Sequence, residues 1–498
     1  MRYIFIISIL FFHLNINSQN IYDAINYNFS NDLGNSRFTS MGGAFGALGG
    51  NLSAISTNPA SGSVFELSRA GGSIILESNN MKSNYFNTNN EAEKTNINYQ
   101  GGMVYVFKNY GSGNLRKFAF GINVQSTNSY SSDLLISGRG NQSIDNFFLN
   151  NSLGLSISDL SVNSNESVTG VYRWLGNNYG YYAQQAFLGY QSYLLNYNDN
   201  DNNFYSLAKY DNGVNITNEV FSRGFNNKIS INLSGLVKDN FHFGFNVNIY
   251  EIDLTKDNIH YEDGFDEDSS VSYIDFRNYL YTRGGGLSFQ LGMIYKLRNI
   301  RIGVSYESPT WFKIEDELEQ EIEVQTIDKI TNEIYTDIVD PRIINLYEYN
   351  YKAPSKLTLS VASIIKNMFI LSFDFDNQNY SSSKFGTKND ETYKNLNLSI
   401  KQNLVAVYNY RFGSEIRLKN FSIRGGFKQS NSPFNDSEIK LNSKSFGIGF
   451  QFENSTLDIG FSSNNIKYNH QLFDTGLTNS AEVNNSQLRS VISYNLIF

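Results

Sequence analysis

Residues 241–249 read FHFGFNVNI, so apolar and polar side chains alternate with a period of two residues. Successive side chains of a β-strand point to opposite faces, and the stretch therefore predicts a strand with one apolar and one polar face. The same alternation recurs in segments 118–125, 228–233, 369–376 and 446–453. The repetition predicts an all-β chain.

Three features favour a membrane barrel over a soluble sandwich, which would show the same alternation. The apolar faces are rich in Phe, Leu, Ile and Tyr, as expected for side chains that face lipid. Short connections alternate with long polar ones, of which residues 130–225 form the largest. The chain ends on a strand whose last residue is the aromatic Phe498, which we expect to be the signal for outer-membrane assembly. We therefore predict a transmembrane antiparallel β-barrel.

The barrel is expected to have about fourteen strands, an even number as in bacterial barrels. Closure would leave no edge strand unpaired in lipid. The expected strands are residues 70–79, 96–108, 116–129, 226–237, 240–254, 280–297, 300–315, 355–365, 368–382, 400–412, 415–429, 442–453, 455–468 and 487–498. Short turns are expected near 109–114, 238–240, 298–299, 366–367, 413–414 and 453–454.

Composition excludes several classes of function. The 498 residues contain no cysteine, which excludes disulfide scaffolds, thiol nucleophiles and Cys-ligated metals. The formal net charge of −8 argues against a nucleic-acid partner. His242, His260 and His470 match no catalytic or metal-binding motif. We expect no enzymatic activity, no metal site and no cofactor.

The first eighteen residues predict a signal peptide. Met1–Arg2 gives a positive start, Tyr3–Leu14 is a short apolar core, and cleavage is expected near Ser18. The apolar core is too short to span a bilayer. The chain is therefore expected to be exported, with domains at 1–18 (signal peptide), 19–68 (N-terminal segment) and 69–498 (barrel).

Residues 19–68 do not alternate and include SRFTSMGGAFGALGGNLSAISTNPASGSVF, from Ser36 to Phe65. Glycines such as Gly42, Gly43 and Gly46 permit tight turns and close packing. Asn58, Pro59 and Ala60 form a turn signal. The segment is too small for a core of its own, whereas the lumen of such a barrel is too wide for its own side chains to seal. We expect a hatch inside the lumen; a periplasmic tail is the alternative.

The glycine-rich run followed by Asn58, Pro59 and Ala60, just before the first strand, resembles the hatch of the FadL family (also called OmpP1/TodX) of outer-membrane channels. The terminal Phe498 fits the same pattern, whereas Ser61 stands where the family has glycine. The resemblance implies passive uptake of hydrophobic compounds such as long-chain fatty acids. Loops would capture the ligand, the lumen would bind it, and a hatch rearrangement would release it through a lateral gap made by a kinked strand.

The long connection 130–225 is unusually aromatic. It carries candidate capture residues for a hydrophobic ligand, or alternatively a small loop core: Tyr172, Trp174, Tyr179, Tyr182 and Phe187. The kink could lie at Gly101–Gly102 or at Gly284–Gly286, since glycines in strands often mark irregularities. The corner Ser308–Phe312 could form part of a pocket mouth or of an interfacial aromatic belt.

The expected partners are a hydrophobic small molecule, outer-membrane lipid and, during biogenesis, the barrel-assembly machinery. We expect a monomer in the cell outer membrane. Two other functions fit the same barrel, a protein-interaction component of a secretion system and a general diffusion porin.

Overall fold

The computed structural model describes residues 21–27, 33–111, 113–386, 391–435 and 440–498. The predicted signal peptide, residues 1–18, lies outside these described residues. Among them, no helix is both long enough and apolar enough to cross a bilayer.

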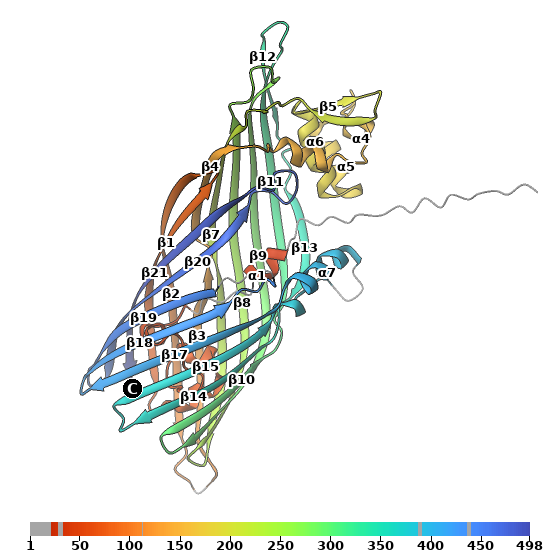
Figure 1. Cartoon of the computed structure of the whole chain (residues 1–498). Coiled ribbons are helices and arrows are strands. Elements are labelled where there is room, and N and C mark those ends of the chain that lie inside the picture. The colour runs from red at the N-terminus through yellow and green to blue at the C-terminus, as the bar shows by residue number, and fades with distance from the viewer. Residues whose placement is uncertain (1–20, 28–32, 112, 387–390, 436–439) are drawn as a thin grey trace, which may run out of the picture.

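A closed antiparallel barrel dominates the structure (Figure 1). Each strand of the ring pairs with the next one, and β21 pairs with β1 from Arg69↔Ile497 to Asn84↔Glu482, which closes the ring. The ring consists of β1 (Arg69–Tyr85), β2 (Thr88–Lys108), β3 (Leu115–Ser129), β7 (Val214–Val237), β8 (Phe241–Asp263), β9 (Val271–Leu297), β10 (Ile300–Glu307), β14 (Lys356–Ile365), β15 (Phe369–Asn379), β17 (Ala406–Leu418), β18 (Phe421–Asn431), β19 (Lys440–Gln451), β20 (Ser455–Gln471) and β21 (Ser480–Ile497). The predicted fourteen-strand antiparallel barrel is confirmed.

The two faces of the wall have opposite polarity. On β15, Leu371 and Phe373 are exposed on the outside, whereas Ser372 and Asp374 are buried on the inside. The outward aromatic and aliphatic side chains continue round the ring, as on β9 and β10. An apolar exterior around a polar interior is the arrangement expected for a barrel in lipid.

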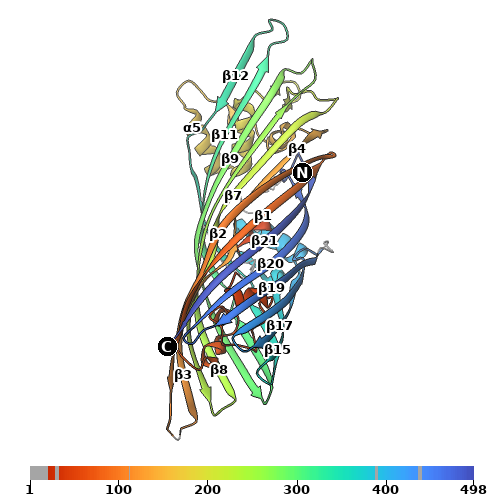
Figure 2. The same cartoon turned by 90° about the vertical axis from the view of Figure 1, so that its left-hand side faces the viewer.

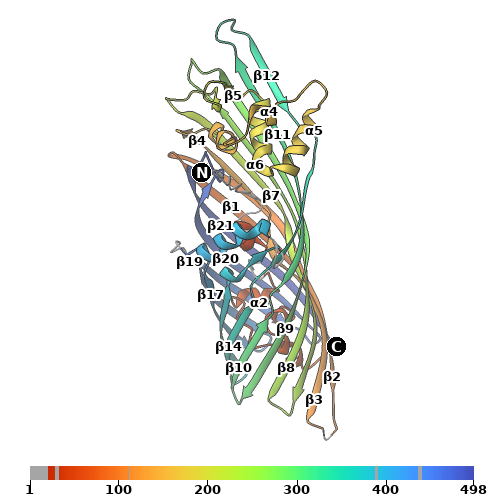
Figure 3. The ribbon, with the colours of Figure 1, turned by 90° about the vertical axis from the view of Figure 1, so that its right-hand side faces the viewer.

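The wall is uneven in height (Figures 1 and 2). β7, β8 and β9 have 23 to 27 residues, far more than the roughly 9–11 that cross a bilayer. Together with further strands they rise above the rest of the rim, and a small helical cap lies beside them (Figure 3). The further strands of the raised wall are β4 (Ser132–Gly140), β11 (Trp311–Ile327), β12 (Ile334–Val339) and β13 (Asn345–Lys352). β5 (Leu195–Asn198) and β6 (Asn203–Ser206) form a separate two-stranded sheet, and the two-residue β16 (Lys384–Phe385) pairs with the end of β13. The cap helices are α3 (Asp145–Asn151), α4 (Ile157–Leu160), α5 (Val168–Asn178) and α6 (Tyr181–Gln191).

Two rims can be distinguished. The short-turn rim contains the turns 109–114, 238–240, 298–299, 366–368, 419–420 and 452–454, and the opposite, long-loop rim carries the cap. Near the long-loop rim the chain also forms η3 (Tyr380–Ser382), η4 (Glu391–Tyr393) and α7 (Lys394–Asn403).

Several expected boundaries are wrong, each for a physical reason. Residues 80–95 and 255–279, which the expected strands leave as connections, are mostly strand, because these polar extensions lack the apolar alternation that predicts a strand. Residues 400–403 belong to helix α7 and not to a strand. Gly413–Ser414 is not a turn but lies inside β17, where a Cβ atom on Gly413 would sit 2.6 Å from the Met41 carbonyl oxygen.

Residues from the N-terminal segment lie within the ring (Figures 1 and 3). The segment forms α1 (Ile21–Asn26), α2 (Ser36–Ser40), η1 (Ser53–Ser56) and η2 (Pro59–Val64). Most side chains from Leu33 to Phe65 are buried against the inner wall. The centre of the barrel therefore contains protein over this stretch of its height.

Candidate functional site

The N-terminal segment approaches the wall where the inward-facing wall residue is a glycine. A Cβ on Gly303 would lie 2.5 Å from the Gly46 carbonyl oxygen, and one on Gly292 would lie 2.7 Å from Pro59 Cδ. Further round the ring, on β18, a Cβ on Gly426 would overlap the Gly42 amide nitrogen. Backbone of the segment occupies the space that these side chains would fill, and the wall sequence thus accommodates the segment.

Asn58 is the most heavily hydrogen-bonded residue of the segment's second half. Its Oδ1 accepts from the Ala60 amide at 3.0 Å, which caps η2. Its Nδ2 donates to the carbonyl oxygens of Gly46 at 2.7 Å, Met293 at 3.2 Å and Val304 at 3.4 Å. The following Pro59 accepts a bond from Asn232 of β7 at 2.8 Å. One side chain thus joins two parts of the segment to β9 and β10.

The three glycines singled out in the sequence also lie in tight places. Gly42 and Gly43 have φ of 62° and 74°, values that favour glycine. The Gly46 amide donates to Asp374 Oδ2 of β15 at 2.9 Å, and a Cβ there would overlap Ser360 of β14. The first half of the segment is therefore fitted to the wall as closely as the second.

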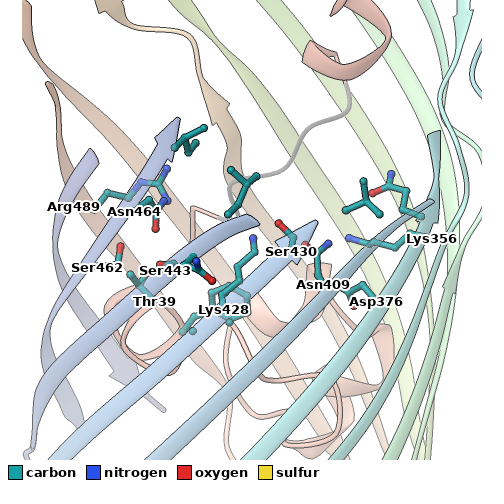
Figure 4. Close-up of a pocket in the computed structure, with 18 of the residues that line it drawn as sticks. Thr39, Lys356, Asp376, Asn409, Lys428, Ser430, Ser443, Ser462, Asn464 and Arg489 are labelled. Carbon is teal, nitrogen blue, oxygen red and sulfur yellow. The ribbon is translucent and has the colours of Figure 1, made fainter. Parts of the chain in front are cut away.

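A pocket lies directly against α2 (Figure 4). Its empty space of about 940 Å³ includes its open side. Three cations line it, Lys356, Lys428 and Arg489. Arg489 is paired with the buried Glu77 at 2.5 Å, and the one carboxylate of the lining, Asp376, is bonded to Arg411 at 2.7 Å. Its apolar lining is contributed by Phe38, Tyr380, Val407, Leu441 and Ile466. We call this space the upper pocket; it combines positive charge with apolar surface.

A smaller, polar pocket continues from the upper one, because Lys356 and Gln378 line both. It is lined by Tyr27 and reaches Gln125 and Thr127 of β3. The Lys228 ammonium and the Glu307 carboxylate, 2.9 Å apart and both buried, lie along it. This connecting pocket leads from the centre of the lumen to the wall at β3.

The wall is interrupted where the connecting pocket meets it. β2 pairs with β3 only from Gln100↔Gln125 to Lys108↔Lys117. Among the described residues, the remainder of β2, Thr88–Tyr99, pairs with β1 alone. The chain instead shifts register near Ser126 and continues as β4 along β7. We call this interruption the β2–β3 seam.

β4 lies on the inner side of β1 at this seam. Inward-facing side chains of β1 donate to this part of the chain, Asn79 to the carbonyl oxygen of Ser131, just before β4, at 2.8 Å and Ser83 to that of Leu135 in β4 at 2.5 Å. The two glycine groups considered as kinks, 101–102 and 284–286, lie in continuous ladders. Ser126–Ser131 therefore contains the bend; it has no glycine of its own, but opposite it Gly224 of β7, with φ of 129°, accepts a hydrogen bond from the Tyr130 amide at 3.0 Å.

A second interruption lies at the corner Ser308–Phe312. There β10 gives way to β11, and β13 gives way to β14 at Ala353–Ser355. The Ala353 amide donates to the Thr310 carbonyl oxygen at 2.9 Å. Trp311 points outward and is exposed, whereas Ser308 and Thr310 line the connecting pocket. The corner therefore places the aromatic ring of Trp311 on the outer surface and the polar side chains of Ser308 and Thr310 in the lining of the connecting pocket.

The aromatic residues of the long connection divide into two groups. Tyr172 and Phe187 are buried between α5 and α6, and the Tyr172 hydroxyl donates to Gln320 Oε1 of β11 at 2.8 Å. Trp174 is 47% exposed, and its ring centroid lies 5.5 Å from that of the exposed Tyr179. Tyr182 is partly buried. The first group holds the cap together, and the second faces outward.

The terminal aromatic residue and two of the histidines considered in the sequence contact neighbouring side chains. The Phe498 ring is exposed on the outside, 5.7 Å from the Tyr105 ring. His242 Nδ1 lies 2.8 Å from the Ser63 hydroxyl, and His260 Nε2 lies 2.8 Å from Glu262. No group of three or more potential metal ligands is found in the described part of the chain.

Sequence reasoning missed the charged lining of the upper pocket. Lys356, Lys428 and Arg489 come from β14, β18 and β21, which are far apart in the sequence. The sequence shows that each of these charged residues stands within an alternating strand, but it does not show which of the charged side chains line the same pocket. That grouping depends on the order of strands round the ring.

The structure defines a class: a closed transmembrane barrel whose lumen contains its own N-terminal segment and a pocket above it. A scan of protein-family models finds no match, and a search of curated proteins finds none either. Solved structures do share the fold. A Pseudomonas aeruginosa FadL homologue matches with a TM-score of 0.54 at 12% identity, covering 94% of this chain and 99% of the other.

Two further structures give the same result. The CymD monoaromatic hydrocarbon channel matches with a TM-score of 0.51 at 12% identity, over 95% of this chain and 99% of the other. The Pseudomonas putida toluene transporter TodX matches with a TM-score of 0.51 at 13% identity, over 94% and 99%. The chain therefore has the fold of the FadL-type channels.

Proposed function

We propose that the protein is an outer-membrane channel for passive uptake of hydrophobic compounds of the long-chain fatty-acid type. The observation that carries the proposal is the upper pocket, in which cations face apolar side chains against α2. A fatty acid needs both kinds of contact, because its carboxylate favours Lys and Arg and its alkyl chain favours burial. The structural relatives described as hydrocarbon and toluene channels support a hydrophobic ligand.

In this proposal the N-terminal segment is a hatch, residues 19–68, and the short-turn rim faces the periplasm. Ligand in the upper pocket would contact Phe38 and Thr39 of α2. A shift of the segment would open the connecting pocket toward Gln125, where the β2–β3 ladder ends. The ligand would leave sideways into the membrane, which favours it because acyl chains dissolve apolar solutes and water does not.

The cap would make the first contact with ligand. Trp174 and Tyr179 offer exposed aromatic surface, with Tyr182 beside them, while Tyr172 and Phe187 hold α5 and α6 in place. Apolar patches that remain exposed often mark ligand-binding surfaces. An always-open diffusion porin is disfavoured, because the segment lies across the lumen.

Uptake of radiolabelled oleate into proteoliposomes tests the proposal. We expect oleate to enter faster than into liposomes without protein, and a polar solute such as sucrose to be excluded. Lys356→Gln/Lys428→Gln should slow oleate uptake, whereas Lys366→Gln, an exposed turn residue, should not. Sucrose entry would indicate a porin, and absence of oleate uptake would overturn the proposal.

A further inference from the structure

A second charged space lies on the other side of α2, toward the short-turn rim. It is lined by Asn35 and Arg37 of the segment, by Arg69 of β1, and by residues of β17 to β20. Its empty space is about 930 Å³ including its open side. Lys419, in the turn between β17 and β18, and Gln451 line it and are exposed. This space, the lower chamber, therefore reaches the rim.

The lower chamber has an excess of positive charge. Five cations line it, against the two carboxylates Glu415 and Asp458: Arg37, Arg69, Arg417, Lys419 and Arg424. Three of these guanidinium groups surround Glu415, with N–O distances of 2.5 to 2.8 Å. Arg424 also binds Asp458 at 2.6 Å.

Arg69 and Lys419 are not part of this network. Arg69 lies over the Phe65 ring, 5.7 Å from its centroid, and neither residue forms an ion pair with any other described residue. A chamber with low-dielectric walls and unbalanced positive charge attracts anions. The chain as a whole carries −8, so the positive charge here is a local feature.

α2 separates the lower chamber from the upper pocket. Phe38 and Thr39 line the space above it, and Asn35 and Arg37 line the space below. Arg37 is the only charged residue between Leu33 and Phe65, and it attaches this helix to Glu415 of β17. The helix thus lies between two spaces that both carry cations.

We propose that the lower chamber is a second binding site, selective for the carboxylate of an amphipathic anion, and that α2 is the partition between the two sites. The anion is held by Arg69 and Lys419, which leave the Glu415 network intact. This inference rests on the proposed function only for the arrival of the anion from the upper pocket. Neutral hydrophobic compounds gain nothing from the lower chamber, so the site distinguishes acids from hydrocarbons.

Octanoate and 8-bromooctanoate are suitable probes, with octanol as the uncharged control. Calorimetry on the full-length protein in detergent should resolve two octanoate sites. Arg69→Gln/Lys419→Gln should weaken one of them by about tenfold, which corresponds to about 1.4 kcal/mol. The matched control Lys238→Gln/Lys366→Gln alters exposed turn residues of the same rim outside the chamber and should leave both sites unchanged.

Crystals soaked in 8-bromooctanoate locate the sites directly by the anomalous signal of bromine. We expect one ligand in the upper pocket and one with its carboxylate beside Arg69. Ligand in the upper pocket alone, or unchanged affinities in Arg69→Gln/Lys419→Gln, would overturn the inference and leave the proposed uptake standing. Binding in the lower chamber without oleate uptake into liposomes would support the second site and overturn the proposed function instead.

Discussion

Replacing Gly292 of β9 with alanine should release the N-terminal segment from the wall. The added Cβ would overlap Asn58 Oδ1 and lie 2.7 Å from Pro59 Cδ and 2.9 Å from Pro59 N. Asn58 would have to move, and its side chain has four hydrogen-bond partners, one that donates to Oδ1 and three carbonyl oxygens that share the two N–H groups of Nδ2. Each bond contributes about 1 kcal/mol, and the longest bonds contribute least. The free energy that holds the segment against the wall should therefore fall by about 3 kcal/mol.

Trypsin provides a direct assay of this release. Arg37 is the only trypsin site between Leu33 and Phe65, and its side chain is 16% exposed while it binds Glu415. When opening is fast, proteolysis follows the population of the open form. A loss of about 3 kcal/mol should therefore raise the rate of cleavage after Arg37 by about a hundredfold.

The same strand supplies the control. Gly285 lies on β9 and is exposed, and the nearest atom to a Cβ there, the Tyr250 carbonyl oxygen, is 3.8 Å away. Gly285→Ala should leave cleavage unchanged. If Gly292→Ala forms a heat-resistant barrel and is cut after Arg37 no faster than the unaltered protein, the wall glycines do not hold the segment in place.

Two more predictions concern the cap. Trp174→Ala removes the larger exposed ring beside Tyr179 and should weaken oleate binding several-fold without altering heat-resistant folding; unchanged binding would exclude the cap surface from capture. Burial raises the pKa of Asp145 in α3 to about 6, so folding of the cap favours the protonated acid. Stability should thus be highest at low pH and fall by up to about 3 kcal/mol as pH rises from 4 to 7. Hydrogen exchange of the α3 amides, corrected for intrinsic rates, should show this fall in stability. Asp145→Asn keeps the acceptor for the Tyr210 hydroxyl and should abolish the fall. An equal fall in the variant would refute Asp145 as its cause.

The sequence predicts the barrel well because the membrane imposes a strict pattern on it. Lipid requires an apolar side chain at every second position, and closure requires every strand to pair. Phe241–Ile249 and Phe369–Asp376 could therefore be recognised without any structure. Above the membrane this requirement ends, so the sequence pattern predicts loops where the polar extensions of β8 and β9 lie.

The site was less predictable, because it depends on contacts across the lumen. The sequence predicts a turn at Gly413, whereas in the structure this glycine makes room for Met41 of the N-terminal segment. The segment Ser126–Ser131 contains no glycine, because the bend lies where the chain separates from β2 while it continues along β7 from β3 into β4. The cations of the upper pocket come together only when β14, β18 and β21 take their places in the ring.

The central claim is that the N-terminal segment must move for a ligand to pass, and a disulfide lock tests it most directly. The chain has no cysteine, and the hydroxyl oxygens of Ser36 in α2 and Ser493 in β21 lie 2.8 Å apart. In proteoliposomes, Ser36→Cys/Ser493→Cys should take up oleate when reduced and stop when oxidised, while each single variant stays active. Equal uptake by the fully oxidised and the reduced protein would contradict the account.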